Sequence, residues 1–250
     1  MGALDGLRIL VTGAASGIGA AIVRRALADG AAVAGLDRDP VPETGGVVSV
    51  TADLSDDAAV RAAVAEAVER LGGLDVLVNN AGIGAQGTVE ANDDEEWHRV
   101  YDVNVLGIVR ATRAALPALR ASEHAAVVNT CSVAASTGLP QRAVYSATKG
   151  AVQALTLAMA ADHLREGIRV NCVNPGTADT PWVQRLLDSS DDPTGERARL
   201  EARQPSGRLV TPEEVAHAVL HLADPRSAST TGTVFAVDGG MHSLRLPAPS

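Results

Sequence analysis

The chain has 250 residues, of which 46% are hydrophobic and 2% aromatic, and its formal net charge is −9. The acidic balance argues against nucleic-acid binding, because proteins that bind a phosphate backbone concentrate positive charge to displace counterions. The chain does not open with a basic segment followed by an apolar one, and no apolar run reaches the length of a membrane span, so we expect a cytoplasmic protein without membrane contact.

Short runs rich in β-branched residues alternate with Ala-rich segments of helical length. The runs read RILVT, AAVAGLD, VVSVTADL, LDVLVNNAG, AAVVNTCS, IRVNCVNPG and TVFAVDGG. This alternation is typical of βα units around a buried parallel sheet, so we predict an α/β fold: a Rossmann-like, doubly wound sheet with helices on both faces. Because no linker divides the chain, we expect one domain over residues 1–250.

The first predicted strand runs into a glycine-rich loop, TGAASGIG, at residues 12–19. Glycines let the backbone turn tightly and approach a pyrophosphate, which then lies at the N-terminus of the helix predicted over 20–28. A plain glycine turn is the alternative, but the strand before the loop and the helix after it favour a dinucleotide site. The residues expected to contact the cofactor here are Gly13, Ser16, Gly17, Ile18 and Gly19.

Acidic residues follow the second and third predicted strands. Asp37 lies eighteen residues beyond Gly19, where a carboxylate can accept hydrogen bonds from ribose hydroxyls and repel a 2′-phosphate, so NAD is the predicted cofactor. The neighbouring Arg38 could offset the charge of that phosphate, which keeps NADP as the alternative. Asp53 and Leu54 would lie at the same edge of the sheet, near the adenine, although a surface Asp before a helix is an equally simple reading.

Lys149 is the only lysine in a chain that carries twenty arginines. It lies four residues after Tyr145, so on a helix the two side chains share a face and can meet at a ligand. An ammonium group presents three donors on a compact charge and stabilises a neighbouring phenolate, which makes the tyrosine a general base. An exposed Tyr-Lys pair is the alternative, but this chain uses arginine for its other cations.

Several of these motifs together resemble the short-chain dehydrogenase/reductase family. They are TGAASGIG, NNAG at 79–82, Asn104, Ser132, YSATK and NPGTADT at 174–180, and the similarity extends from Leu7 to about Met241. The resemblance implies that Tyr145 is the acid/base, that Lys149 tunes it and contacts the cofactor with it, and that Ser132 orients the reacting oxygen. It also implies that Asn104 holds a water that relays protons through Lys149.

The same resemblance implies further cofactor contacts at the ends of the fourth and sixth strands. Asn79 would be a structural residue that joins strands, whereas the next three residues would bring their backbone to the cofactor. Glycine again permits close approach. The additional residues implied to contact the cofactor are Asn80, Ala81, Gly82, Pro175, Gly176, Ala178 and Thr180.

The substrate side of the site is predicted from arginines and from the stretch Thr180–Gly207. This long stretch reads as irregular, as binding lids usually are, and it carries Trp182 and Arg203. Arg142 stands three residues before Tyr145, where a guanidinium could hold a substrate acid beside the catalytic phenol. A solvated surface charge is the alternative for each arginine.

Within the family, the segments QRAVYS, NPGTADTPWVQ and ARQPSGRLVTPEEVA resemble cytosolic type 2 3-hydroxybutyrate dehydrogenases and 2-keto-3-deoxy-L-fuconate dehydrogenases. That resemblance implies that Arg142 and Arg203 recognise an acid. Trp182 replaces a smaller residue, and Arg185 is displaced by one position from the expected pattern, so both depart from these relatives.

The other candidate sites are few. Cys131 and Cys172 lack the spacing of a disulfide framework or a metal site and are expected to be reduced, packed thiols. His217 and His221 are spaced i, i+4 but lack the glutamate of a zinc-protease helix, so we predict no metal. Alanines at 147, 151, 154, 158 and 161 form a stripe on the helix of Tyr145, and the resemblance implies a homodimer or homotetramer contact there.

These observations predict an NAD-dependent oxidoreductase that transfers a hydride between its cofactor and a secondary alcohol of a small hydroxy acid or sugar acid. One alternative is an NADPH-dependent ketoreductase of the 3-oxoacyl reductase type, which Asp37 disfavours. The other is a non-catalytic NAD-sensing protein, which the filled catalytic positions disfavour.

Overall fold

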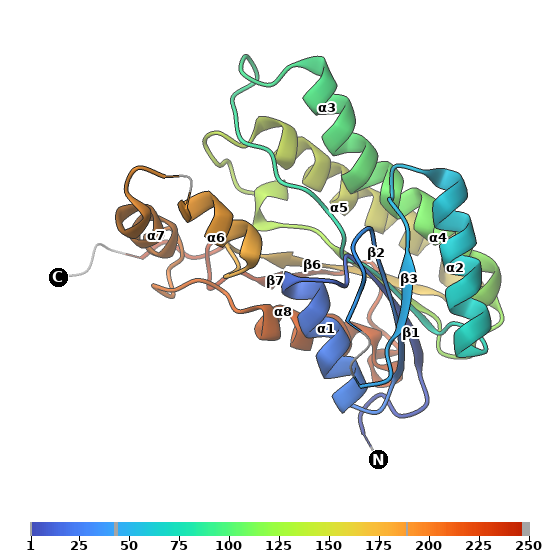
Figure 1. Cartoon of the computed structure of the whole chain (residues 1–250). Helices are drawn as coiled ribbons and strands as arrows, with labels where there is room; N and C mark the ends of the chain where they lie inside the picture. Colours follow the sequence, from blue (N-terminus) through green and yellow to red (C-terminus); the bar gives the residue numbers. More distant parts are fainter. Residues whose placement is uncertain (1, 43–44, 189, 247–250) are drawn as a thin grey trace.

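The computed structural model describes residues 2–42, 45–188 and 190–246 and contains one seven-stranded parallel sheet (Figure 1). Residues 1, 43–44, 189 and 247–250 of the predicted domain lie outside the described part. The strand order is β3-β2-β1-β4-β5-β6-β7. The strands are β1 (Arg8–Thr12), β2 (Ala32–Asp37), β3 (Val48–Thr51), β4 (Val76–Asn79), β5 (Ala126–Thr130), β6 (Arg169–Pro175) and β7 (Val234–Val237). Each predicted run contains one of them, so the predicted fold class is confirmed.

Helices cover both faces of the sheet, because successive strand residues point to opposite sides. On one face, Ile9 and Val11 pack with residues of α1 (Gly17–Ala28) and α8 (Pro212–Ala223). On the other face, Leu10 packs with residues of α2 (Asp57–Leu71), α4 (Gly107–Arg120) and α5 (Ala143–His163). Figure 1 shows α1 and α8 together on one side and α2, α4 and α5 on the other. The core therefore consists of two apolar layers with the sheet between them.

The order of the strands decides where a ligand can lie. The chain moves outward from β1 to β2 and β3, then crosses back to place β4 on the other side of β1. Crossovers that leave in opposite directions open a crevice beyond the carboxyl ends of these two strands. The predicted cofactor residues after Thr12 and Asn79 face that crevice.

Asn79 fastens the sheet behind the crevice, as predicted. Its side-chain amide donates to the Asn129 Oδ1 atom at 2.9 Å, which links β4 to β5. Asn129 in turn donates to the Thr156 hydroxyl of α5 at 2.9 Å. This buried chain of hydrogen bonds joins two strands to the helix that carries Tyr145 and Lys149.

Two predictions about helices need correction. Residues 180–207 are not irregular, because they contain α6 (Pro181–Asp188) and α7 (Pro193–Ala202), and α1 begins at Gly17 rather than at residue 20. Val183, Leu187, Leu200 and Leu209 form a small core of their own between these segments. The two helices are thus held by mutual packing at the carboxyl end of the sheet.

Local interactions account for further features of the chain. Thr211 caps α8: its hydroxyl accepts from the Glu214 backbone N–H at 3.2 Å, and the Glu214 carboxylate accepts from the Thr211 N–H at 2.8 Å. Cys131 and Cys172 are buried free thiols. Within the described ranges, none of the helices has the length and apolar character to cross a membrane.

Candidate active site

The glycine loop leaves room for a ligand at the start of α1. A Cβ atom at Gly13 would lie 2.7 Å from the Ala81 Cα atom, and one at Gly19 would collide with the Gly13 carbonyl oxygen. Ser16 precedes α1 in an extended conformation, and its side chain makes no capping hydrogen bond. The first N–H groups of the helix therefore keep their donors for a ligand in the crevice.

The segment after β4 is tied to this loop. The Thr12 hydroxyl accepts hydrogen bonds from the backbone N–H groups of Asn80 at 3.0 Å and Ala81 at 3.1 Å. The Asn80 side-chain amide donates to the carbonyl oxygens of Thr12 at 3.1 Å and Gly13 at 3.2 Å. The two edges of the crevice thus hold each other in place.

Asp37 lies at the carboxyl end of β2 and faces the glycine loop. Its Oδ2 atom accepts from the Ala15 N–H at 2.9 Å. The Arg38 guanidinium is exposed and lies 3.8 Å from the Asp39 carboxylate, a separation typical of a weak surface pair. The structure thus places a fixed carboxylate in the crevice next to a solvent-exposed, weakly paired arginine.

Asp53 and Leu54 follow β3 at the same edge. Hydrogen bonds from the Ser55 backbone N–H at 2.8 Å and from its hydroxyl at 2.7 Å lower the pKa of Asp53. Leu54 is buried, and its side chain lies 3.0 to 3.1 Å from where a Cβ at Gly107 would lie. The edge therefore offers one ionised carboxylate and one apolar surface.

Tyr145 and Lys149 lie one turn apart on α5 and both face the cavity. The Lys149 Nζ atom is 5.7 Å from the centroid of the Tyr145 ring and donates to the Thr130 carbonyl oxygen at 2.9 Å. Lys149 is only 4% exposed, and it has no carboxylate partner within the described part of the chain. Its charge is held in place by a backbone dipole at the end of β5 rather than by an ion pair.

Ser132 follows β5 and stands at the start of a short 3-10 helix, Val133–Ala135. Its hydroxyl oxygen accepts from the Ala134 N–H at 3.2 Å, which fixes the side chain. Ser132 and Tyr145 both line the cavity, so the structure brings together the two hydroxyl groups that the sequence placed at the reacting oxygen.

Asn104 lies in a π-helical turn, Asp102–Leu106, between α3 (Asp94–Tyr101) and α4. Its Oδ1 atom accepts from the Ile83 N–H at 2.7 Å, and its amide donates to the Ile83 carbonyl at 2.9 Å and to the Thr148 hydroxyl at 3.1 Å. A Cβ at Gly82 would lie 3.1 Å from this Oδ1 atom. The side chain is fully enclosed behind Gly82 and does not reach the cavity.

The 180–207 segment covers the crevice. The Thr180 side chain and the Pro181 ring lie 3.6 and 3.7 Å from where a Cβ at Gly17 would lie, so the start of α6 rests on the glycine loop. The indole of Trp182 packs against the backbone of Gly84. This segment therefore touches both the cofactor side and the substrate side of the site.

Arginines gather at the substrate side. The Arg142 Cζ atom lies 5.7 Å from the centroid of the Trp182 ring, in a cation–π arrangement. Burial lowers the pKa of Arg142, and the positive charge of the nearby Arg203 lowers it further. Within the described ranges, neither of these guanidinium groups nor that of Arg185 forms an ion pair with a carboxylate.

One cavity of about 830 Å³ unites these groups. Every residue predicted for the cofactor, the catalytic groups or the substrate lines it except Gly19, which lies behind the Gly13 carbonyl, and Asn104. The lining also contains residues that sequence reasoning missed, among them Thr130, whose carbonyl binds Lys149, Gly84 and Thr177. The sequence does not indicate which backbone carbonyl will bind a side chain. The glycine at position 84 was the one sign that another group could lie close to the backbone there.

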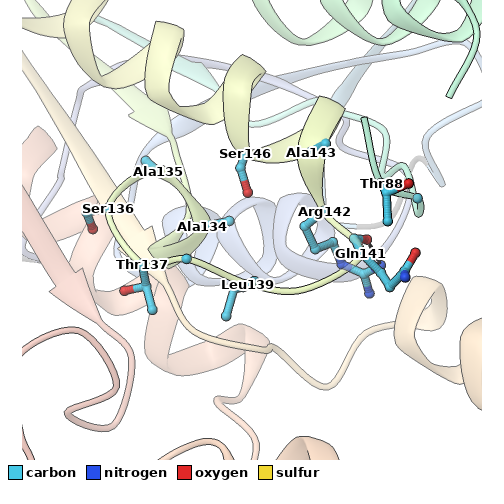
Figure 2. A pocket seen from close by; sticks show the side chains of 12 residues that line it. Thr88, Ala134, Ala135, Ser136, Thr137, Leu139, Gln141, Arg142, Ala143 and Ser146 are labelled. Carbon is cyan, nitrogen blue, oxygen red and sulfur yellow. Dashed lines mark hydrogen bonds between the residues drawn. The ribbon is translucent and has the colours of Figure 1, made fainter. Parts of the chain in front are cut away.

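A second, shallower hollow of about 420 Å³ lies beside the first and is drawn in Figure 2. It is formed by the loop that precedes α5, and it shares Ala134, Leu139 and Arg142 with the larger cavity. Gln141 has a left-handed backbone with φ of 59°, which is uncommon for a residue with a side chain. Its carbonyl oxygen accepts from the Arg142 Nη1 atom at 3.0 Å.

The described residues include no group of three or more His, Cys, Asp or Glu side chains arranged for a metal ion.

Known proteins resemble this chain over most of its length. A family profile described as "Enoyl-(Acyl carrier protein) reductase" matches residues 13–242. The protein named "Inactive 2-(S)-hydroxypropyl-CoM dehydrogenase 2" of Xanthobacter autotrophicus is 45% identical over 231 residues, which cover 89% of this chain and 100% of the relative. A second protein of that organism, "2-(S)-hydroxypropyl-CoM dehydrogenase 3", is 42% identical over 247 residues, with 94% and 96% covered. The "Cis-4-hydroxycyclohexanecarboxylate dehydrogenase" of Sinomonas cyclohexanicum is 39% identical over 244 residues, with 92% and 94% covered.

The structure also resembles solved structures. The aldohexose dehydrogenase of Thermoplasma acidophilum in ligand-free form matches with a TM-score of 0.92 and 33% identity over 99% of this chain and 98% of that one. The chain belongs to the short-chain dehydrogenase/reductase family, and the protein is an oxidoreductase. The relatives named here carry other names than the 3-hydroxybutyrate and 2-keto-3-deoxy-L-fuconate dehydrogenases that the motifs resemble, so the comparisons show the family and leave that narrower resemblance a prediction.

Proposed function

We propose that the protein is an NAD-dependent dehydrogenase that oxidises the secondary alcohol of a small hydroxy acid or sugar acid. One observation carries the proposal: Ser132, Tyr145 and Lys149 line the same cavity as the glycine loop and Asp37. A hydroxyl group held at these side chains would have its carbon next to the nicotinamide end of a dinucleotide that lies along the crevice.

The residues of the crevice fit a dinucleotide. The start of α1, which has no side-chain cap, suits a pyrophosphate, and Gly13 allows the loop to pack closely on Ala81 beside it. Asp37 suits two ribose hydroxyls. NAD, when bound, supplies the acceptor for a hydride. Its contacts would come from the glycine loop, from Asn80, Ala81 and Gly82, and from the residues after β6.

The chemistry that falls to the chain is the movement of one proton. The Ser132 hydroxyl donates to the substrate oxygen and so fixes the direction of that oxygen, because its own oxygen already accepts from the Ala134 N–H. The single proton of the substrate hydroxyl passes to the Tyr145 phenolate as the carbon loses a hydride and the C–O bond becomes a carbonyl. The Lys149 ammonium favours the phenolate through its charge, and its bond to Thr130 leaves two of its three donors for other partners. In the reverse reaction Tyr145 returns the proton to the carbonyl oxygen.

Asn104 would support the exit of that proton indirectly. Because both N–H groups of its side-chain amide already have protein acceptors, a relay water would bind the backbone carbonyl of the π-helical turn rather than the amide. We therefore assign Asn104 as a positioning residue for the segment at Gly82 and for the Lys149 environment.

An acid is the favoured substrate because Arg142, Arg185 and Arg203, on the substrate side of the cavity, form no ion pair with a carboxylate in the described part of the chain. Arg142 and Arg203 repel each other, and an anion between them relieves that repulsion. The name of the cis-4-hydroxycyclohexanecarboxylate dehydrogenase describes a secondary alcohol on a carboxylic acid, which agrees with this choice. The 180–207 segment would act as the lid over this acid.

A coupled rate assay tests the proposal. The purified protein would be incubated with NAD or NADP and with matched pairs of hydroxy acids and neutral secondary alcohols, while reduced nicotinamide is followed by absorbance. We expect NAD with acids to give the highest kcat/KM. A preference for NADP would support the ketoreductase alternative, and equal rates for acids and neutral alcohols would remove the role of the arginines.

The relative named as inactive gives the non-catalytic alternative a specific reason to be tested. If NAD bound tightly in calorimetry while a broad panel of hydroxy acids and polyols gave no turnover, the protein would be an NAD sensor instead. The filled positions Asn104, Ser132, Tyr145 and Lys149 favour catalysis. A cytoplasmic location and a dimer or tetramer through the alanine stripe of α5 remain predictions.

A further inference from the structure

The indole of Trp182 lies so close to residue 84 that this residue has no room for a side chain. A Cβ atom added at Gly84 would fall inside the indole, and it would lie 2.9 Å from the Nε1 atom. The backbone of Gly84 is outside the left-handed region, so its conformation does not call for glycine. What a side chain at residue 84 would obstruct is the indole of Trp182.

The indole also lies beside Arg142. The guanidinium lies over the ring at 5.7 Å, and one of its nitrogens, Nη1, is already bound to the Gln141 carbonyl oxygen. A guanidinium stacked on an aromatic face keeps its edge free, and the edge carries the donors that bind a carboxylate. Trp182 therefore holds Arg142 in an orientation that suits an acid.

The indole also limits the space beside that arginine. The cavity measures about 830 Å³ and must accommodate both a dinucleotide and a substrate. Trp182 spans from Gly84 to Arg142 across the substrate side, and both of these residues line the cavity as well. A substrate whose acid group is bound at Arg142 thus has its chain confined between the indole and Tyr145.

We propose that Trp182, seated on Gly84, is the specificity-determining residue of this site, and that it restricts the substrate to short-chain hydroxy monocarboxylic acids. This proposal rests on the proposed function, because it concerns the same cavity and the same acid. Gly84 is the positioning residue, since its missing side chain allows the indole to lie where it does.

The fluorescence of Trp182 can be used to follow the position of its own indole. The chain has two tryptophans, and Trp97 of α3 does not itself line the cavity, although it packs in the apolar cluster that contains Tyr145. In a Trp97→Phe background, emission comes from Trp182 alone. We expect Gly84→Ala to shift this emission to longer wavelength, because the added methyl group displaces the ring into water. Gly138→Ala is the matched control, because a Cβ there meets nothing within 4 Å.

Binding of non-reacting acids tests the effect on specificity. Butyrate and hexanoate would be titrated by calorimetry into the NAD-loaded protein, which requires no turnover. We expect the original protein to bind butyrate more tightly, and Trp182→Ala to shift the ratio of the two affinities toward hexanoate by at least about tenfold, since an added methylene changes discrimination by that order. Gly84→Ala should shift the ratio in the same direction, Trp182→Phe less, and Gly138→Ala not at all.

The outcomes separate this proposal from the proposed function. An unchanged ratio in Trp182→Ala, an unchanged emission in Gly84→Ala, or no binding of either acid would overturn the inference, even if alcohols were oxidised normally. A shifted ratio in a protein that oxidises no alcohol would support the inference about the pocket and overturn the proposed reaction.

Discussion

The Lys149 ammonium donates a 2.9 Å hydrogen bond to the carbonyl oxygen of Thr130, the last residue of β5. The end of a central strand thus fixes the position of the ammonium charge relative to Tyr145. A Cβ at Gly82 would lie 3.5 Å from the Nζ atom, so the ammonium is enclosed on that side as well. The space suits a compact cation and leaves little room for a planar one.

Replacement of Lys149 by arginine should abolish most of the activity although the positive charge is kept. The larger, planar guanidinium cannot occupy the ammonium position between Thr130 and Gly82, so it no longer stabilises the phenolate of Tyr145. We expect kcat at neutral pH to fall by about 10² to 10⁴, the range for a lost general base. Steady-state rates with NAD measure this, with calorimetry of NAD binding beside them. Undiminished turnover of the variant at neutral pH would contradict the role of the lysine.

Asp37→Ser should weaken the preference for NAD. The change removes the negative charge that would repel a 2′-phosphate but keeps a short acceptor near the Ala15 N–H. We expect the ratio of kcat/KM for NAD to that for NADP to fall by about tenfold or more, since one charge pair at this range is worth at least 1.4 kcal/mol in a partly enclosed site. Asp57→Ser, which removes an exposed partner of Arg61 outside the cavity lining, is the control and should leave the ratio unchanged.

Arg203→Ala should affect acids selectively. The guanidinium lines the cavity and faces Arg142, so its loss should raise KM for a hydroxy acid by about tenfold or more while the rate with the matching neutral alcohol stays constant. Arg199→Ala, in the helix that ends just before Arg203, removes an exposed ion pair with Glu196 and is the control. Equal effects of the two variants, or a loss with neutral alcohols as well, would assign Arg203 to the stability of α7 instead.

Asp75→Asn should lower stability in a pH-dependent way. Burial alone would raise the pKa of Asp75, but hydrogen bonds from Arg8 and Ser122 outweigh it and lower the pKa to about 2. A carboxyl group with a depressed pKa stabilises the fold above its unfolded pKa, near 3.9, and this contribution is lost as the pH falls through about 2.

We therefore expect Asp75→Asn to lose about 2 kcal/mol of unfolding free energy at pH 6 to 7, because two pKa units correspond to roughly that amount. The difference from the original protein should shrink below pH 4. Urea denaturation across this pH range measures it. Glu66→Gln, which removes an exposed i, i+4 pair with Arg70, should cost about 0.5 kcal/mol or less and serves as the comparison. A constant difference at all pH values would attribute the loss to packing.

The features that repeat along the chain could be predicted from the sequence. Strands appear as apolar runs because both faces of a parallel sheet are buried, and the glycine loop is recognisable because it lies between a strand and a helix. The pairing of Tyr145 with Lys149 follows from helical spacing alone. These features depend on local order in the chain, which the sequence displays directly.

The features that could not be predicted depend on contacts between distant segments. The helices α6 and α7 have mixed, charged sequences, and they are held by the cluster of Val183, Leu187, Leu200 and Leu209. The contact of Trp182 with Gly84 joins residues about a hundred positions apart, and neither carries a sign of the other. Likewise, nothing in the sequence indicates that Lys149 donates a hydrogen bond to the Thr130 carbonyl.

The π-helical turn Asp102–Leu106 positions Asn104 and also determines which face of α4 packs against the sheet. An α-helix advances about 100° per residue, so the one surplus residue of this turn offsets the inner face of α4 from that of α3 by that angle. A deletion of one residue here would restore a continuous helix, but it would also rotate Ala111, Ala115 and Leu119 away from the sheet that they cover. The surplus residue of this turn therefore sets both the position of Asn104 and the register of the hydrophobic layer that α4 contributes.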